Sequence, residues 1–407
     1  MTPAPEDARP PGPSTLAVHG PRAPQRPVPA TVVGPVHRGT TYPLDAAGLD
    51  DVEATGGEGT WYYGRLRNPT NARVAAAIAA LERAPAGEVF ASGMAAIGTM
   101  LTALVPPGGR LVAAAELYGD TRALLEGEWA AAGRRVTYVD VADLDGMTRA
   151  LRDGADALLV EALSNPMLRV ADLPRLAELA HAGGATAIVD ATFASPVNVR
   201  PYELGFDVVL HSATKYLNGH TDLIAGAVAG HEHLVARVRA LAAQRGATLD
   251  PGGAYLLERG LKTLVVRMER HNANGLAVAT WARGHADVAA VAYPLLDDHP
   301  DRELARRVLS GGSGMVTITV AGDPGRGRRL LGELRLIAHA ASLGGVESLA
   351  CLPSATSHAT LSEAERRHQG IAANTVRLSL GIEDAGDLVA DLESALARSA
   401  RTAPIGA

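Results

Sequence analysis

The sequence has little of what would place it in a membrane or an oxidising compartment. Its 407 residues include a single cysteine, Cys351, so no intramolecular disulfide can form and a reducing environment is favoured. No stretch approaches the roughly 20 continuous apolar residues of a membrane-spanning helix. The first residues, MTPAPEDARPPGPS, lack the apolar segment of a secretory signal. We therefore expect a cytoplasmic protein with no membrane partner.

The formal net charge is −6, so nothing in the charge balance favours a nucleic-acid partner. Lysine is nearly absent, with Lys215 and Lys262 standing against 36 arginines. Arginine can replace lysine on a surface, but a guanidinium cannot form a Schiff base at neutral pH. A chain so poor in lysine is expected to keep it where a primary amine is needed, although chance survival is the alternative. Lys262 lies in a helical pattern where arginine would serve equally well, which leaves Lys215 as the stronger candidate.

The pattern along the chain predicts an arm followed by two folded domains. Residues 1 to about 35 are rich in proline and alanine without a period, and we expect an extended or disordered arm within residues 1–60. Short apolar runs alternate with helical patterns from about 69 to 230. This alternation predicts a mostly parallel seven-stranded sheet, covered by helices on both faces, in a large α/β domain at 61–255. The predicted strands are Glu88–Ser92, Arg110–Ala115, Arg134–Asp140, Ala157–Leu163, Thr186–Thr192, Asp207–Ser212 and Ile224–Gly230.

The pattern changes after about residue 255. A long helical stretch at about 257–285 precedes an apolar run at 314–320, and the chain closes with the helical pattern DAGDLVADLESALARSA. We expect a smaller α+β domain at 256–407.

Three polar features follow predicted strands of the large domain. At Ser92, Gly93 and Met94 a strand gives way to a helix, whose first N–H groups can bind a phosphate; this signal is weak alone, since it matches neither GxGxxG nor a P-loop. Asp190 ends a very apolar strand, where it either caps a turn or pairs with a ligand. Lys215 follows the next strand, flanked by the hydroxyl groups of Ser212 and Thr214.

Asp190 and Lys215 are one βαβ unit apart, so both are expected at the same edge of the sheet. An amine, a carboxylate and a phosphate-binding turn at one edge are what pyridoxal phosphate (PLP) requires. They supply a Schiff base, a partner for the ring nitrogen and an anchor for the phosphate. The combination is stronger evidence than any one of the three, and it involves no metal.

Seven motifs in order resemble those of the Cys/Met-metabolism PLP enzymes, which include cystathionine γ-synthase, cystathionine γ-lyase, methionine γ-lyase and homoserine-ester sulfhydrylases. The opening TLAVHG is also similar, and the resemblance extends from about 15 to 400. It implies the fold-type-I PLP architecture. The motifs are WYYGRLRNPT (61–70), SGMAAI (92–97), ELYGDT (116–121), EALSNP (161–166), TKYLNGHTD (214–222), SLGGVESL (342–349) and TVRLSLGIED (375–384).

The resemblance implies a role for each matching residue around the cofactor. Lys215 would form the Schiff base and move the substrate's proton, Asp190 would pair with the ring nitrogen, and Tyr118 would stack on the ring and assist proton transfer. The residues that match phosphate contacts are Gly93, Met94, Ser212 and Thr214, together with Tyr63 and Arg65, which would reach the phosphate of a neighbouring subunit. The resemblance therefore implies a homo-oligomer with shared active sites, usually a tetramer.

On the substrate side, Arg377 and Asn165 match groups that hold the α-carboxylate, and Ser342 matches a residue near them. Arginine suits bidentate carboxylate binding, although a structural ion pair is an equal alternative for Arg377 on the sequence alone. Glu347 matches a glutamate of the cystathionine enzymes that can meet a distal ammonium group, but a solvated loop charge is as good an interpretation.

This sequence departs from the family's pattern at three places. Ala191 stands where asparagine is usual, and the loop PSATSHAT (353–360) is a loose version of the family's own. Asp120 stands where the cystathionine enzymes mostly have glycine and methionine γ-lyases have cysteine. The resemblance places this carboxylate near the leaving-group end of the substrate.

We therefore predict PLP-dependent γ-elimination or γ-replacement on a γ-substituted L-amino acid of the cystathionine or O-acylhomoserine type. Within the family, methionine γ-lyase, a homoserine-ester sulfhydrylase and an enzyme of specialised biosynthesis are alternatives. Outside it, the alternatives are a PLP aminotransferase and a catalytically silent binding protein on the same fold. Retention of Lys215, Asp190, Tyr118 and Arg377 argues against the last.

Overall fold

The computed structural model of the chain describes residues 11–20, 31–55, 59–359 and 361–400. Residues 1–10 and 21–30 of the predicted arm lie outside the described residues, as does Thr360 of the 353–360 loop. The arm is expected to be partly extended or disordered; within it, Pro13–His19 form helix α1 and Ala46–Thr55 form helix α2. Helix α1 buries Ala17 and packs on α3 (Pro69–Glu82) and on α11 (Leu264–Arg283). Those contacts, rather than any local pattern, stabilise it.

All seven predicted strands are present and form one sheet in the order β1-β7-β6-β5-β4-β2-β3. Neighbouring strands from β6 to β3 run parallel, whereas β7 is antiparallel to both β6 and β1. The expectation of a mostly parallel seven-stranded sheet is confirmed. The strands are β1 (Ala86–Phe90), β2 (Arg110–Ala114), β3 (Arg135–Val139), β4 (Ala157–Glu161), β5 (Thr186–Asp190), β6 (Val208–His211) and β7 (Gly226–Gly230).

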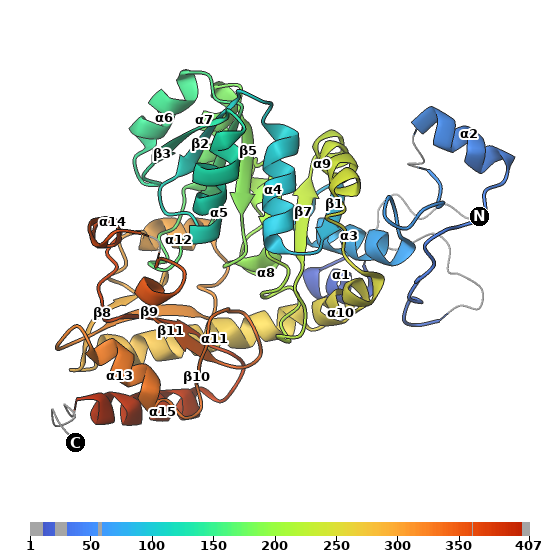
Figure 1. Cartoon of the computed structure of the whole chain (residues 1–407). Helices are drawn as coiled ribbons and strands as arrows, with labels where there is room; N and C mark the ends of the chain where they lie inside the picture. The colour runs from blue at the N-terminus through green and yellow to red at the C-terminus, as the bar shows by residue number, and fades with distance from the viewer. Residues whose placement is uncertain (1–10, 21–30, 56–58, 360, 401–407) are drawn as a thin grey trace.

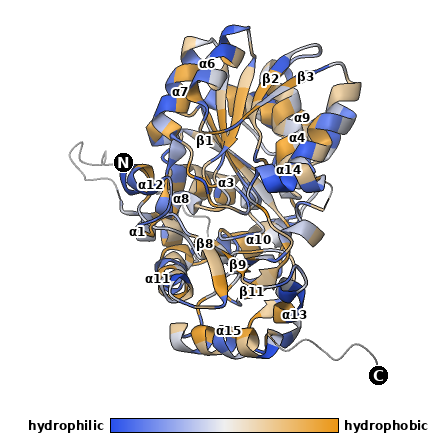
Figure 2. Cartoon of the chain, turned by 90° about the vertical axis from the view of Figure 1, so that its left-hand side faces the viewer, coloured by the Kyte–Doolittle hydropathy of each residue, from blue (hydrophilic) through white to orange (hydrophobic). Residues whose placement is uncertain are grey.

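Helices cover both faces of this sheet, with α6 and α7 on one side and α4 and α9 on the other (Figure 2). The inner strands β2, β4, β5, β6 and β7 are almost entirely buried, which explains their apolar sequences, whereas the edge strand β3 has no fully buried residue. The helices of this part are α3, α4 (Gly93–Leu104), α5 (Gly119–Leu124), α6 (Leu144–Arg152), α7 (Leu173–Ala182), α8 (Ser195–Asn198) and α9 (Glu232–Arg245), with a π-helical turn at Leu125–Trp129 and a 3-10 turn at Pro201–Leu204.

A second, five-stranded sheet forms from the C-terminal part of the chain, in the order β10-β11-β12-β9-β8 (Figure 1). It has its own buried apolar cluster, to which α11 and α15 contribute, so the predicted α+β character is confirmed. The strands are β8 (Val288–Ala292), β9 (Met315–Val320), β10 (Ala338–His339), β11 (Leu349–Cys351) and β12 (Thr375–Ser379). The helices are α10 (Pro251–Leu261), α11, α12 (Arg302–Val308), α13 (Arg326–Glu333), α14 (Glu363–His368) and α15 (Ala385–Ser399), with a 3-10 turn at Pro353–Ala355.

The carboxyl ends of β4, β5 and β6 lie side by side. Glu161 pairs in register with Asp190, and Asp190 pairs with Leu210, one residue before His211. Polar side chains that follow these strands are therefore gathered at one edge of the large sheet. None of the described helices is long and apolar enough to cross a membrane.

Candidate active site

Lys215 lies half-buried in the turn that follows β6. Its Nζ donates a hydrogen bond to the Ser342 Oγ at 2.7 Å. Burial, aided by the positive charge of Arg377, lowers the pKa of Lys215 to about 8. A large share of the amine is therefore neutral and nucleophilic at mildly alkaline pH, as Schiff-base formation requires.

Asp190 ends β5, and its Oδ1 accepts a hydrogen bond from the Thr192 backbone N–H at 2.9 Å. Burial raises the pKa of Asp190, while the Thr192 hydrogen bonds and the charge of His211 act in the opposite direction. Neutral hydrogen-bond donors thus hold the Asp190 carboxylate in place, and nearby positive charge compensates its negative charge only in part. Such a group favours a cationic partner.

The strand-to-helix turn at Gly93 packs closely against the segment that carries Lys215. A Cβ atom at Gly93 would lie 3.0 Å from the Ser212 Oγ and 3.3 Å from the Ser212 Cα, so a larger residue would crowd this approach. The Ser92 side chain caps α4 by accepting the Ala95 N–H. The N–H groups of Gly93 and Met94 have no partner within the helix by its geometry, which makes this turn suited to an anion.

Thr214 lies in the same segment, but its hydroxyl already has two backbone partners. It donates to the Ala225 carbonyl at 3.1 Å and accepts from the Ala225 N–H at 3.0 Å. A cavity of about 290 Å³ opens beside it and is lined also by Ser342. Ser212 and Thr214 lie in the same segment as Lys215, and Gly93 packs against Ser212. The predicted phosphate residues are therefore close to Lys215.

Arg377 projects from β12 of the smaller sheet and is 5% exposed. Its Nη1 donates to the Asn165 Oδ1 and its Nη2 to the Ser342 carbonyl, each at 3.0 Å. Among the described residues its buried Nε has no hydrogen-bond partner, and the centroid of the Phe193 ring lies 6.0 Å from the guanidinium carbon. Ser342 thus links the amine of Lys215 to the guanidinium of Arg377, and the arginine retains a donor for a further anion.

Tyr118 and Asp120 form a hydrogen-bonded pair, because the Tyr118 hydroxyl donates to the Asp120 Oδ2 at 2.5 Å. Burial and this hydrogen bond raise the pKa of Tyr118 to about 12, although Arg377 opposes the shift. Asp120 therefore faces Tyr118, which the sequence alone did not indicate.

Three predicted site residues are not part of this cluster. Glu347 accepts a hydrogen bond from Thr221 at 3.1 Å, and Thr221 lines the cavity beside Ser342, so Glu347 lies near its rim. Tyr63 pairs with Thr41. The Arg65 guanidinium lies 5.4 Å from the Tyr63 ring and bonds to the Ala243 carbonyl on α9. Within its own chain, neither Tyr63 nor Arg65 contacts the Lys215 cluster.

Sequence reasoning missed Glu161. This buried carboxyl group at the end of β4 accepts the Tyr118 backbone N–H at 2.6 Å, and the Asn165 backbone also bonds to it. Burial, followed by the charge of Asp190, raises the pKa of Glu161 well above its usual range. The signal was present in the sequence, since Glu161 ends an apolar strand just as Asp190 does.

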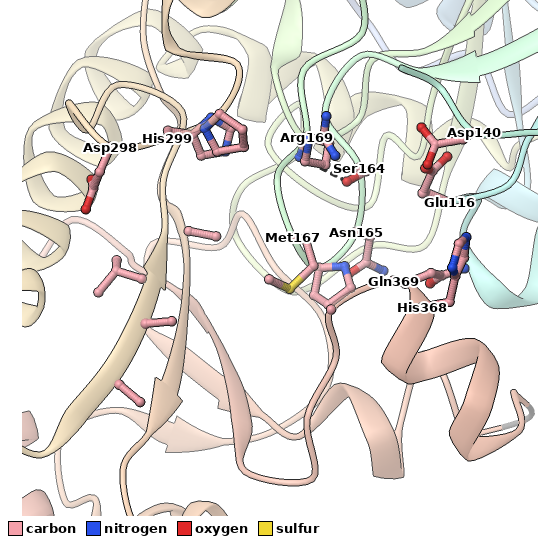
Figure 3. A pocket seen from close by; sticks show the side chains of 17 residues that line it. Glu116, Asp140, Ser164, Asn165, Met167, Arg169, Asp298, His299, His368 and Gln369 are labelled. Carbon is pink, nitrogen blue, oxygen red and sulfur yellow. Dashed lines mark hydrogen bonds between the residues drawn. The ribbon is translucent and has the colours of Figure 1, made fainter. Parts of the chain in front are cut away.

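Asn165 also lines a second cavity, of about 500 Å³, together with Glu116, Asp140, Arg169 and His299 (Figure 3). Lys215 and Arg377 are not among its lining residues. Arg169 is neutralised there by Asp301, 2.6 Å away. Asn165 therefore lies between Arg377 and a distinct cavity that is lined by both acidic and basic side chains.

Comparison with known proteins is consistent with this geometry. Residues 14–397 match the family described as Cys/Met metabolism PLP-dependent enzyme. This chain belongs to that family. It is 39% identical to L-methionine gamma-lyase of Pseudomonas putida over 96% of this chain and 98% of that protein. It is 40% identical to cystathionine gamma-synthase of Mycobacterium tuberculosis over 95% of this chain and 97% of that protein.

The structure resembles that of cystathionine gamma synthase from Xanthomonas oryzae pv. oryzae in complex with aminoacrylate and cysteine. The TM-score is 0.90 at 34% identity, covering 96% of this chain and 99% of the other. The predicted family, the fold-type-I architecture and the PLP cofactor are thereby confirmed.

The described residues fit PLP. The Lys215 amine suits a Schiff base, and the undercompensated carboxylate of Asp190 suits a protonated ring nitrogen. The gap left by the missing side chain of Gly93, facing Ser212 at the start of α4, suits the phosphate.

Proposed function

We propose that this enzyme catalyses γ-elimination or γ-replacement on a γ-substituted L-amino acid of the cystathionine or O-acylhomoserine type. One observation carries the proposal: Ser342 bonds to the Lys215 amine through its side chain and to the Arg377 guanidinium through its backbone. A substrate whose α-carboxylate binds Arg377 would present its α-carbon to Lys215. The relatives named cystathionine gamma-synthase, cystathionine gamma-lyase and L-methionine gamma-lyase support the same class of reaction.

Each residue contributes a distinct action. The free amine of Lys215 removes the α-proton, as its lowered pKa permits. Arg377, with Asn165 beside it, orients the carboxylate. When bound, PLP accepts the electron pair left at the α-carbon. Asp190 would hold the ring nitrogen of the bound cofactor in its cationic form, and Tyr118 would assist proton transfer at the departing group.

The substrate's distal part is proposed to meet Asp120 and Glu347. Glu347 lies near the rim of the cavity beside Ser342 through its bond to Thr221, where a carboxylate attracts a distal ammonium group. This favours cystathionine over methionine, whose γ-substituent carries no charge.

We further propose a cytoplasmic homotetramer in which Tyr63 and Arg65 serve the phosphate site of a neighbouring subunit. Their separation from Lys215 within one chain supports this assignment. The proposed division into an arm (1–60), a PLP-binding domain (61–255) and a small domain (256–407) is supported by the two separate sheets.

A substrate panel tests the proposed reaction. Cystathionine, O-acylhomoserines, methionine and a γ-halogenated analogue are each incubated with the enzyme, with and without cysteine, and the products are identified by mass spectrometry. We expect loss of the γ-substituent, yielding an α-keto acid and ammonia or, with the thiol, a new thioether. An α-keto acid that retains its γ-substituent would identify an aminotransferase and overturn the proposal.

A further inference from the structure

Asp120 and Tyr118 form an ordered unit at the start of α5. The distance of 2.5 Å from the Tyr118 hydroxyl to the Asp120 Oδ2 is that of a short, charge-assisted O–H···O hydrogen bond. The Tyr118 backbone is fixed as well, because its N–H donates to Glu161 at 2.6 Å. Both ends of the tyrosine are therefore held by carboxyl groups.

The turn that connects the two residues is also constrained. A Cβ atom at Gly119 would meet the Ser357 carbonyl oxygen, so the 353–359 segment presses directly on this turn. This contact fixes the backbone from which Tyr118 and Asp120 project. The hydrogen bond therefore joins two exposed side chains that project from a backbone turn held in place by packing.

The groups around Tyr118 decide whether its hydroxyl is protonated. Burial and the carboxyl groups of Asp120 and Glu161 disfavour the phenolate, whereas Arg377 favours it. Together these effects raise the pKa of Tyr118 to about 12. The 353–359 segment adds only His358, which is neutral at pH 7 because burial and Arg377 lower its pKa to about 4. Helix α4, which packs on α5, carries no titratable side chain. Tyr118 is thus a neutral phenol at any pH at which the enzyme would work.

We propose that Asp120 is a positioning residue that acts through Tyr118, so that the two form a proton relay. The proton that the incoming amino acid's ammonium must lose bonds to the Tyr118 oxygen. At the same time the Tyr118 O–H bond breaks and its proton bonds to the Asp120 carboxylate. The protonated Asp120 then returns the proton through Tyr118 to the departing γ-heteroatom. The return step rests on the function proposed above, whereas the first step does not.

The relay gives this chain a substrate preference. A thiolate or alkoxide is a poor leaving group until it is protonated, whereas a carboxylate leaves readily as an anion. The relay therefore benefits thioethers and ethers more than acyl esters. This deepens the proposed function by naming thioether-type γ-substituents as the class that Asp120 serves.

Asp120→Asn in the holoenzyme tests the relay, because asparagine can still accept the Tyr118 hydrogen bond but cannot take up its proton. We expect kcat/KM at pH 7 to fall by at least about tenfold, a modest part of the usual contribution of general acid–base catalysis. Loss of the carboxylate lowers the pKa of Tyr118, so the phenolate forms at lower pH. The ratio of variant to wild-type kcat/KM should then rise as the pH increases from 7 to 9.5. A ratio independent of pH would show a merely structural role and overturn the proposal.

Tyrosinate absorbance near 295 nm gives a second readout that needs no substrate. After subtraction of the matching Tyr118→Phe spectra, Asp120→Asn should show a tyrosinate signal by about pH 10 that the wild type lacks. Glu126→Gln is the matched control, since it removes a carboxylate that raises the pKa of a different tyrosine, the half-buried Tyr138. It should leave the Tyr118 signal unchanged. Identical Tyr118 signals in wild type and Asp120→Asn would overturn the relay, whatever the substrate panel shows.

Discussion

The cofactor linkage can be assigned by comparing Lys215 with Lys262, because they are the only lysines in the sequence. Lys215 donates to Ser342 and has a pKa lowered to about 8, whereas Lys262 follows the last turn of α10. We expect borohydride reduction of the holoenzyme to fix the cofactor on the Lys215 peptide alone, as read by peptide mass spectrometry. Lys215→Ala should abolish this linkage and Lys262→Ala should preserve it.

The pH dependence of cofactor attachment follows from the same pKa. Below pH 8 most of the Lys215 amine is protonated and cannot attack an aldehyde, so reconstitution of cofactor-free protein should accelerate as the pH rises through about 8. A cofactor that remains attached in Lys215→Ala would contradict the assignment.

Single residues at the site were predictable to different degrees. Asp190 and Lys215 could be identified because each follows an apolar strand and each has the chemistry that PLP needs. The hydrogen bond between Asp120 and Tyr118 could not, because residues two apart at the start of a helix do not ordinarily face each other. Glu161 ends an apolar strand as Asp190 does, but its role depends on backbone N–H partners, which no side-chain motif reveals.

At the scale of elements, the start of α4 is the feature most sensitive to substitution. Gly93→Ala would place a Cβ 3.0 Å from the Ser212 Oγ, so that Ser212 must give by a few tenths of an ångström. We expect PLP to bind at least about tenfold more weakly, because the phosphate loses the geometry of its N–H donors. The dissociation constant is measured by absorbance titration of the cofactor-free protein.

Gly98→Ala on the same helix is the control. Its Cβ would meet the Leu124 side chain at an ordinary 3.5 Å, and alanine favours the helix by up to about 1 kcal/mol. We expect unchanged PLP affinity and equal or higher thermal stability. Equal PLP affinity in both variants would show that Gly93 is not part of the phosphate site.

The elements themselves followed from the sequence where they are buried and regular. All seven strands of the large sheet were found as apolar runs, but β1 ends at Phe90 because Ser92 caps α4. The antiparallel direction of β7 was not predictable, since a fully buried strand has the same apolar sequence in either direction. Helix α1 escaped prediction because the surfaces that stabilise it, on α3 and α11, are remote in sequence.

At the scale of the whole molecule, Tyr63 and Arg65 distinguish a self-contained site from a shared one. We expect Arg65→Ala and Lys215→Ala to be inactive separately but to complement each other when co-expressed. In a mixed dimer one of the two sites receives both intact residues, so about a quarter of all sites should be active under random pairing. Activity and light scattering on the purified mixture provide the measurement.

The control for this experiment mixes two variants that damage the same side of the site, Lys215→Ala and Asp190→Ala, which should not complement. A protein that is monomeric in solution, or a mixture as inactive as its components, would contradict the shared site.

The position of β1 has a consequence for how the chain folds during synthesis. Its partner in the sheet is β7, with Ala86 opposite Gly230, so β1 leaves the ribosome long before β7 does. Until then its apolar residues Val89 and Phe90 lack the neighbour that buries them in the finished sheet. Strands so far apart in the sequence pair late and slowly during folding. Until they pair, β1 presents an unpaired edge to other chains. We therefore expect β1 to be the segment on which nascent copies of this protein depend most for chaperone protection.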